Sequence, residues 1–310
     1  MFTSFRRGFR IASFAPNIIN TAPIMASKAA QAPPQVVGAD DLGPVRLPVD
    51  KETYQFDDWT IGYTKSHILK SVCVNGETCV AEDPGCCELC VYNFALALPH
   101  LPDMVFHRNV LRITHSSGAQ LEFNPLDALK LVRNEKLDLK VACSDEWRES
   151  RPEASQTADK VKPFDWTFST EYAGTVNERF RVEPTEQRID MFKLMRKEEI
   201  LFYHNLTLFE DELHDHGISL LSVKVRVMPS GFYVLLRFFL RVDNVLLRSN
   251  DTRFHYEKGN DYVLKEFTHR EAKVEQLKHI PPALFTNPDH IVDKLPVVRK
   301  VNEKLTIVQP

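Results

Sequence analysis

The most regular hydrophobic pattern in the chain lies between residues 220 and 256. Valine alternates with basic residues at 223–227, which predicts a strand with one buried face. The Met-Pro-Ser-Gly sequence at 228–231 predicts a turn, and a long apolar strand is expected over 232–242. After a second turn the chain returns, so the three strands should form an antiparallel meander. Apolar residues at successive positions of the long strand predict that both of its faces are covered.

Shorter patterns predict the other elements. A strand is expected at 59–63, where the ordered chain should begin, and a hairpin at 109–123 around a Ser-Ser-Gly turn. Asn124 followed by Pro125 is typical of a helix N-terminus, so a helix should run to about residue 133. The remaining expected elements are strands at 137–143, 166–172, 179–183 and 261–268, a short helix after Ser144, and short helices broken by prolines beyond residue 280.

Residues 186–203 carry apolar side chains at near-helical spacing and predict the longest helix of the chain. Ile189, Phe192 and Met195 would lie on its buried face. No internal repeat and no domain boundary is visible between residues 51 and 310. The expected fold class is therefore α+β, a single domain with an antiparallel β-sheet core around the meander 220–256 and with flanking helices.

The first 39 residues differ from the rest, because they contain no Asp or Glu and carry Arg6, Arg7 and Arg10. An arginine-rich, acid-poor start is typical of a mitochondrial targeting peptide. A disordered tail with a few arginines has the same composition. Residues 1–50 are therefore expected to form a disordered or targeting-like extension, and a mitochondrial location through residues 1–30 is the alternative to a cytoplasmic one.

Composition narrows the class of protein. Of the 310 residues, 43% are hydrophobic and 26% are charged, which is typical of a globular chain. The net charge of -3 lacks the basic excess expected of a nucleic-acid-binding domain. No apolar run reaches the length of a membrane-spanning helix. Glycine-rich phosphate-binding motifs, the serine nucleophile elbow and the His-Glu-x-x-His zinc motif are absent, so no catalytic signature points to an enzyme.

Five of the six cysteines lie in one segment, between Cys73 and Cys90. A zinc site of this type usually takes two close pairs of ligands separated by about 12–20 residues. Here Cys87 and Cys90 form one such pair, and no matching second pair is present. The spacing therefore predicts free thiols in the cysteine-rich segment 73–98.

A metal-dependent enzyme is the alternative function, and it rests on the acidic sequence around His214 and His216. Residues two apart point the same way on an extended chain, so these two imidazoles could share an ion with acidic neighbours. The competing interpretation is an acidic, solvated turn between two strands, ended by Gly217.

Residues 248–253 read Arg-Ser-Asn-Asp-Thr-Arg, directly after the meander. Asn and Asp favour turn backbones, so a turn is expected at Asn250 and Asp251. The flanking arginines, Arg253 among them, would form a charged rim able to meet an acidic partner. The residues alone favour the interpretation as a turn.

From about Trp59 onward the chain resembles the TIPRL family, the TOR signalling pathway regulator-like proteins. The resemblance covers most of residues 100–290 in order. The matching stretches are 109–118 (NVLRITHSSG), 122–129 (EFNPLDAL), 139–151 (LKVACSDEWRESR), 162–166 (KPFDW), 208–217 (LFEDELHDHG), Met228-Pro229, 238–241 (FFLR), 250–253 (NDTR) and 281–286 (PPALFT).

The resemblance implies a non-catalytic regulator that binds and restrains the catalytic subunits of type 2A protein phosphatases (2A, 4 and 6) in TOR-linked signalling. It also implies a cytoplasmic location, no cofactor, and an alpha-four-type phosphatase-associated protein as a further partner. Neither nucleic acid nor a membrane is an expected partner. Ile189 would be exposed at the start of its helix, against the periodicity, and the family carries a Met at the position of Ser249. The expected partner-binding residues are Asp127, Ile189, Ser249, Asn250, Asp251 and Arg253.

The resemblance carries two further expectations. An Asp251→Asn change should weaken phosphatase binding and leave stability nearly unchanged. The cysteine-rich segment 73–98 should be variable, since family members have a shorter, cysteine-free connection there.

Overall fold

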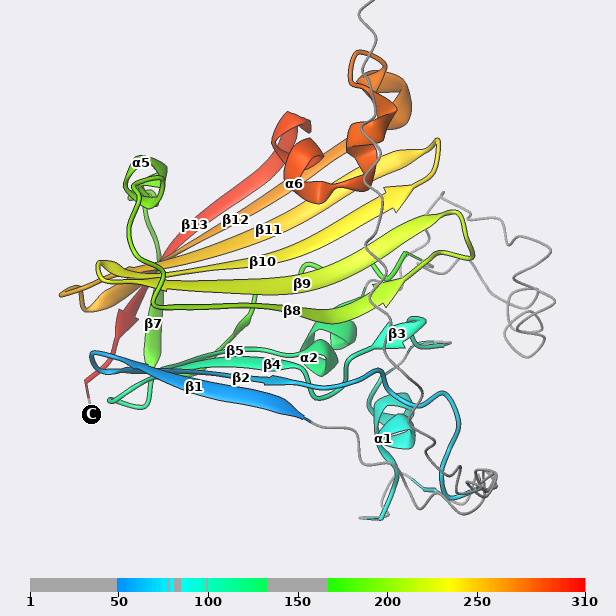
Figure 1. Ribbon diagram of the computed structural model, residues 1–310, viewed down its shortest axis with the longest axis horizontal. Helices are drawn as coiled ribbons and strands as arrows, with labels where there is room; N and C mark the ends of the chain where they lie inside the picture. The colour runs from blue at the N-terminus through cyan, green and yellow to red at the C-terminus, as the bar shows by residue number, and fades with distance from the viewer. Residues whose placement is uncertain are drawn as a thin grey trace, which may run out of the picture. The chain divides into compact units, whose positions relative to one another are not determined.

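The computed structural model describes residues 49–76, 79–80, 85–96, 98, 100–132 and 167–309. Residues 47–310 form one compact unit. Two antiparallel sheets of this unit lie face to face, as Figure 1 shows. The expected extension at 1–50, apart from its last two residues, lies outside the described residues, as do the expected strand at 137–143 and the expected helix after Ser144.

The smaller sheet has five strands and carries the predicted hairpin. Its strands, in spatial order, are β1 (Asp50–Phe56), β2 (Trp59–Lys65), β4 (Val110–His115), β5 (Gln120–Phe123) and β6 (Thr175–Val176). The strand predicted at 59–63 and the hairpin at 109–123 are therefore confirmed. The chain begins its regular structure earlier than expected, because β1 pairs along its whole length with β2.

The larger sheet has eight strands, and a five-strand meander forms most of it. The spatial order is β3 (Met104–Val105), β8 (Phe202–Asp211), β9 (Gly217–Met228), β10 (Gly231–Val242), β11 (Leu246–Glu257), β12 (Tyr262–Lys273), β13 (Val297–Ile307) and β7 (Phe180–Pro184). The meander predicted from residue 220 onward is confirmed, and it is longer than expected at both ends. The sequence analysis missed β13, which pairs with β12 and β7.

Helices are few and short in the described residues. The α-helices are α1 (Glu88–Ala95), α2 (Pro125–Lys130), α5 (Met191–Leu194) and α6 (Pro288–Ile291), and the 3-10 helices are η2 (Val274–Leu277), η3 (Pro282–Thr286) and η4 (Val292–Lys294). The predicted cap at Asn124 is confirmed, since its side chain accepts a hydrogen bond from the backbone N–H of Asp127 at 2.8 Å. Two antiparallel sheets accompanied by short helices agree with the predicted α+β class.

The main core fills the space between the two sheets. Trp59 of the smaller sheet packs against Phe232 and Tyr256 of the larger one, with ring centroids 5.1 Å apart in both pairs. The central strand β10 is covered on both faces, as predicted. Phe238 points into the core between the sheets, whereas its neighbour Phe239 belongs to a second apolar cluster on the outer face.

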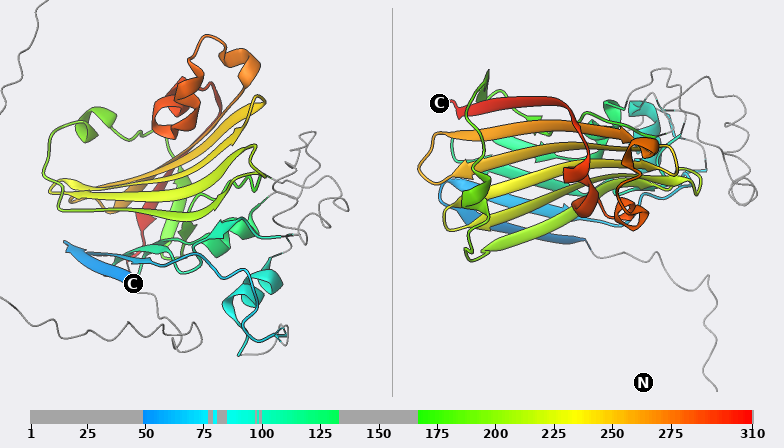
Figure 2. Two further views of the ribbon diagram at one scale, coloured as in Figure 1. Left: turned by 45° about the vertical axis from the view of Figure 1, so that its right-hand side comes forward. Right: turned by 90° about the horizontal axis from the view of Figure 1, so that it is seen from above.

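The outer face of the larger sheet is covered at its two ends and polar between them. At one end Phe239 and Leu247 pack with apolar side chains of the C-terminal helices, and at the other Met228 and Leu264 pack with Ile189 and Leu194 of the α5 segment. Figure 2 shows α5 and α6 on the same side of the sheet, at opposite ends. Positions between these two clusters are free to carry charged side chains.

The long helix predicted over 186–203 does not form. The chain makes only the four-residue helix α5 there, and β8 begins at Phe202 and pairs with β9. Ile189 and Leu194 are buried, but Phe192 and Met195 are exposed, so the predicted apolar stripe is also wrong in part. The pairing of β8 with β9 supplies backbone hydrogen bonds along a whole strand, and this tertiary gain outweighs the local helical pattern.

Two further local predictions are wrong. The expected turn at Asn250 and Asp251 lies in the middle of β11, which continues to Glu257. The expected strand over 166–172 is reduced to a single bridge between Val132 and Thr170. Within the described residues, no helix combines the length and the apolar character needed to cross a bilayer.

Candidate functional site

The strand β11 separates the predicted site residues onto opposite faces of the larger sheet. Side chains of a strand alternate between faces, so Ser249, Asp251 and Arg253 share the outer face, and Asn250 points to the inner one. Asn250 donates to the backbone carbonyl of Thr170 at 2.7 Å and contacts the His269 ring nitrogen at 2.6 Å. Asn250 therefore forms hydrogen bonds inside the fold. Ser249, Asp251 and Arg253, on the outer face, belong to the candidate surface.

Asp251 is the centre of an ion-pair network on the outer face. Its side chain is 1% exposed, and Arg237 lies directly opposite it on β10. Arg237 donates from Nε and Nη2 to the two carboxylate oxygens, at 2.8 and 2.7 Å. Arg253 donates to the same carboxylate at 3.1 Å and Ser249 Oγ at 3.0 Å. The carboxylate of Asp251 is thus fully hydrogen-bonded within the chain, which stabilises a buried charge.

Arg237 extends the network toward α6. Its Nη1 donates to Asp289 at 2.6 Å, and Lys224 of β9 donates to the second oxygen of Asp289 at 3.2 Å. Burial alone would lower the pKa of Arg237, but the hydrogen bond and the charge of Asp251 outweigh it and raise the pKa. A small hollow beside α6 is lined by Lys224, Arg237 and Asp289 with polar side chains of β8 and β9. Positive and negative groups therefore alternate across this part of the surface.

Ile189 is connected to the same face through Glu266 of β12. The backbone N–H of Ile189 donates to Glu266 Oε1 at 2.9 Å, and Arg188 donates to the same carboxylate at 2.7 Å. Glu266 is the register partner of Arg253. Ile189 itself is buried, so its expected exposure is wrong and the periodicity was the better guide.

Next to the buried Ile189, the α5 segment presents apolar side chains to solvent. The exposed fraction is 81% for Phe192 and 66% for Met195. Leu194 faces the sheet and holds the segment in place. Large apolar groups exposed beside a charged network are typical of surfaces that bind other proteins.

Asp127 lies at the N-terminus of α2, behind the smaller sheet's edge strand β6. Its carboxylate accepts hydrogen bonds from Asn124 at 2.9 Å and from Thr175 at 2.8 Å, and Lys130 lies 3.6 Å away. It borders an open depression whose other lining residues include Tyr172 and Gly174. Asp127 thus does not belong to the network around Asp251, and the structure divides the predicted site residues between two places.

The stability contribution of Asp127 is expected to depend on pH. Partial burial alone would raise its pKa, but the hydrogen bonds from Asn124 and Thr175 and the charge of Lys130 lower the pKa below the ordinary 3.8. A carboxyl group whose pKa is lower in the folded state stabilises the fold above its ordinary pKa, and this contribution is lost as the pH falls through the folded value. Urea unfolding should therefore show the native chain more stable than Asp127→Asn at pH 7, and this difference should shrink as the pH falls below 3.8 and through the lower folded pKa. A difference that does not shrink as the pH falls would contradict this assignment.

The acidic sequence around His214 and His216 forms the turn between β8 and β9. Leu213, His214 and Asp215 have φ values of 50°, 58° and 67°, so the chain is not extended there and the two imidazoles do not share a face through strand alternation. Asp211 accepts hydrogen bonds from the N–H groups of Leu213 at 2.8 Å and of Asp103 at 3.0 Å. In the described part of the chain neither histidine belongs to a group of three or more converging metal-ligand side chains.

Four of the clustered cysteines do converge, although their spacing did not predict it. The Sγ atoms of Cys73, Cys79, Cys87 and Cys90 all lie within 4.8 Å of one another. The hydrogen bond from the backbone N–H of Cys87 lowers the pKa of the Cys79 thiol to about 6, whereas desolvation raises that of Cys86 to about 11. This is the one group of three or more potential metal ligands in the residues that the structure describes.

A family model described as the TIP41-like family matches residues 104–278, which is more than half of the chain. The chain belongs to the TIP41-like family. TIP41-like proteins of Rattus norvegicus and Homo sapiens are both 47% identical to it, over 82% and 81% of this chain and 89% and 88% of their own lengths. The type 2A phosphatase activator TIP41 of Saccharomyces cerevisiae is 33% identical, over 81% of this chain and 74% of its own length. The resemblance drawn from the sequence motifs is therefore confirmed.

The region shared with the TIP41-like family contains the whole charged network except Asp289. It begins at Met104 and ends at residue 278, so it includes β8 to β12 and lies beyond the cysteine segment. Sequence reasoning missed Arg237 and Glu266 as members of the site. Arg237 did leave a signal, because a charged residue inside a strand expected to be buried on both faces requires a partner.

Proposed function

We propose that this TIP41-like chain is a non-catalytic regulator that binds the catalytic subunits of type 2A protein phosphatases. The observation that carries the proposal is the connection through Glu266, which holds the Ile189 segment against the face of Asp251 and Arg253. Two segments far apart in the sequence that were expected to bind the phosphatase, around Ile189 and around Asp251, are thereby joined, although these two side chains are themselves buried. The name of the yeast relative, a type 2A phosphatase activator, supports the same class of partner.

The surface offers two kinds of contact. Phe192 and Met195 can enter apolar pockets of a partner, and aromatic anchors of this kind supply much of the binding energy of protein interfaces. The guanidinium group of Arg253, on the outer face, can meet an acidic group of the partner. Asp251 acts as a positioning residue, because its carboxylate is buried and already bonded to both arginines.

The finer proposal follows the family resemblance. Binding restrains the catalytic subunits of phosphatases 2A, 4 and 6 in TOR-linked signalling, in the cytoplasm, with an alpha-four-type protein as a further partner. Relatives from Saccharomyces cerevisiae and Schizosaccharomyces pombe are named activators, which is the opposite direction. Dephosphorylation of a small phosphate ester by a purified catalytic subunit, with and without this chain, distinguishes the two directions.

Replacing Phe192 by serine should weaken binding to a purified 2A-type catalytic subunit about tenfold or more, while the melting temperature stays unchanged. The ring is 81% exposed, so its loss removes a contact available to a partner and little of the fold. Biolayer interferometry beside a thermal melt measures both quantities.

Phe94→Ser is the matched control for this variant, since Phe94 is another exposed phenyl ring, on α1, outside the proposed surface. It should bind the catalytic subunit with native affinity. Equal affinities of the native chain and the Phe192→Ser variant would remove α5 from the binding surface. An absence of binding by the native chain would overturn the proposed function itself.

A further inference from the structure

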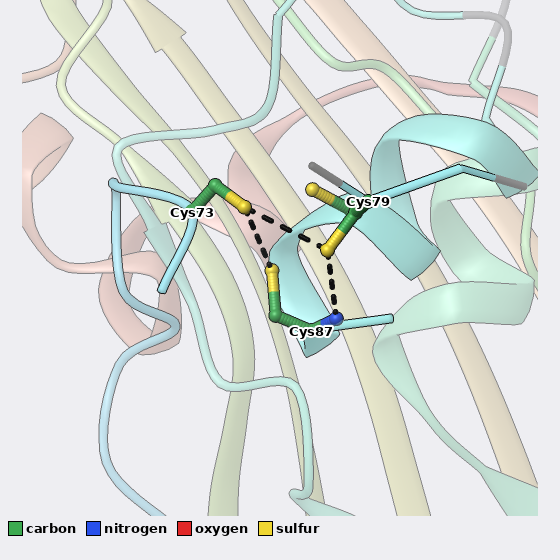
Figure 3. A group of neighbouring side chains, drawn as sticks. Cys73, Cys79 and Cys87 are labelled. Carbon is green, nitrogen blue, oxygen red and sulfur yellow. Dashed lines mark hydrogen bonds between the residues drawn. The ribbon is translucent and has the colours of Figure 1, made fainter. Parts of the chain in front are cut away.

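The four converging cysteines come from two pieces of chain between β2 and β3. Cys73 and Cys79 belong to irregular chain, while Cys87 is the N-cap residue of α1 and Cys90 lies in the first turn of that helix. Figure 3 shows Cys73, Cys79 and Cys87 with their sulfur atoms turned toward one another. Cys73 and Cys79 thus form the second pair of ligands that the spacing did not predict. Five residues lie between them in the sequence.

Two of the sulfur separations match those of a tetrahedral metal site, and none of them exceeds 4.8 Å. Cys73 Sγ lies 3.7 Å from both Cys79 Sγ and Cys87 Sγ. Four sulfurs placed about 2.3 Å from a central Zn²⁺ in a tetrahedron lie about 3.8 Å from one another. A disulfide would bring two of them to about 2.05 Å. The arrangement therefore has the dimensions of a four-thiolate cage around an ion.

Hydrogen bonds around the sulfurs add a second layer to this cage. Cys79 Sγ accepts from the backbone N–H of Cys87 at 3.3 Å and from Asn75 Nδ2 at 3.2 Å. N–H donors to the ligand atoms are typical of metal sites, because they orient the ligands and offset the charge of the thiolates. The N-terminus of α1, where Cys87 and Cys90 lie, favours negative charge as well.

The chain between β2 and α1 buries little apolar surface that could stabilise it. The side chains of Val72, Val74 and Val80 are all more than half exposed. The helix α1, by contrast, is anchored, since Tyr92 is buried and its hydroxyl donates to the backbone carbonyl of His107 at 3.1 Å. A cross-link from Cys73 and Cys79 to the start of α1 would fix the irregular chain to an element that is already in place.

We propose that Cys73, Cys79, Cys87 and Cys90 bind one Zn²⁺ ion in a closed, structural four-thiolate site. Thiolate ligands favour soft or borderline metals, and Zn²⁺ accepts a tetrahedral set of four sulfurs. Binding releases the protons of the thiols that are still protonated and leaves no coordination position for water or substrate. The site therefore stabilises the segment between β2 and β3 and takes no part in catalysis.

Metal analysis of the full-length protein, purified under reducing conditions and dialysed, tests this proposal. Native protein should contain one zinc per chain, and Cys73→Ser and Cys90→Ser should each contain at least tenfold less. Cys86→Ser is the matched control, because Cys86 neighbours the cluster without belonging to it, and it should keep its zinc. Replacement of zinc by Co²⁺ should produce the intense visible absorption of a tetrahedral thiolate site.

A measurement on the native protein tests the proposal even if a cysteine variant fails to fold. Removing zinc with a chelator should open residues 66–100 to limited proteolysis while the far-ultraviolet circular dichroism of the two sheets is retained. Three results would each overturn the proposal. The native protein could contain no bound metal, it could contain iron or copper in place of zinc, or freshly purified protein could contain disulfides among these cysteines. Because the cysteines lie outside the surface proposed for phosphatase binding, either proposal can fail while the other stands.

Discussion

Replacing Asp251 by alanine should lower the free energy of unfolding by about 3–5 kcal/mol, because it leaves the buried guanidinium of Arg237 without its carboxylate. Arg237 would lose two hydrogen bonds at once, and Arg253 and Ser249 would each lose one. The ion pair with Asp289, whose side chain is 55% exposed, then remains to balance the charge of Arg237. A loss of this size is a large share of the roughly 5–15 kcal/mol that stabilises a typical domain.

The buried ion pair also changes the result expected for Asp251→Asn. An exposed turn would tolerate this change, but on β11 the amide places an NH₂ group against a guanidinium and removes the charge that balances it. Stability should fall together with phosphatase affinity, because both arginines lose the group that positions them. A variant with unchanged stability would return Asp251 to the exposed position that the sequence suggested.

Urea unfolding of three variants compares the stability contributed by the buried Arg237–Asp251 pair with that of an exposed ion pair. The variants are Asp251→Ala, Glu257→Ala and a double variant. Glu257→Ala is the control, since it breaks the exposed ion pair with Lys193 and should cost under about 1 kcal/mol. The double variant Arg237→Leu/Asp251→Leu should recover much of the stability that Asp251→Ala loses, because it removes both buried charges together. A double variant less stable than Asp251→Ala would contradict the account.

Replacing Phe238 by alanine should also cost about 3–5 kcal/mol. The ring is 1% exposed, in the middle of β10, and lies between the two sheets with the ring of Phe209 6.5 Å away. Both sheets contribute residues to the surrounding cluster, so the cavity left by the ring cannot close without moving one sheet against the other. A lower melting temperature and a lower denaturation midpoint should both be measurable.

Phe192→Ala is the matched control for this second variant. The chemical change is identical, but the ring of Phe192 is 81% exposed, so little apolar surface returns to water on truncation. Its unfolding free energy should stay within about 0.5 kcal/mol of the native value. Similar losses in the two variants would mean that Phe238 is not in the core between the sheets.

The sequence predicted the elements whose signals are local and agree with one another. In the meander, alternating and apolar stretches are separated by turn residues at the positions where the strands end. The cap at Asn124 needs only its neighbours Pro125 and Asp127. Where a local signal opposed the tertiary structure, the tertiary structure prevailed. The helix predicted over 186–203 should have included Phe202 and Tyr203, yet these residues begin β8 because β9 offers a ladder of hydrogen bonds.

By itself, the sequence determined the α+β class, the strand meander and the family resemblance. Of the residues at the candidate surface it named Ser249, Asp251 and Arg253 and missed Arg237 and Glu266. Only the tertiary structure decided what those residues do. Arg237 faces Asp251 because the register of β10 with β11 places them opposite each other, and this makes a residue expected at an exposed turn part of a buried ion pair. The cysteines likewise converge only when the irregular chain folds back onto α1. Spacing along a chain limits which side chains can meet, but the long-range packing that brings them together is set by contacts that no local window of sequence contains.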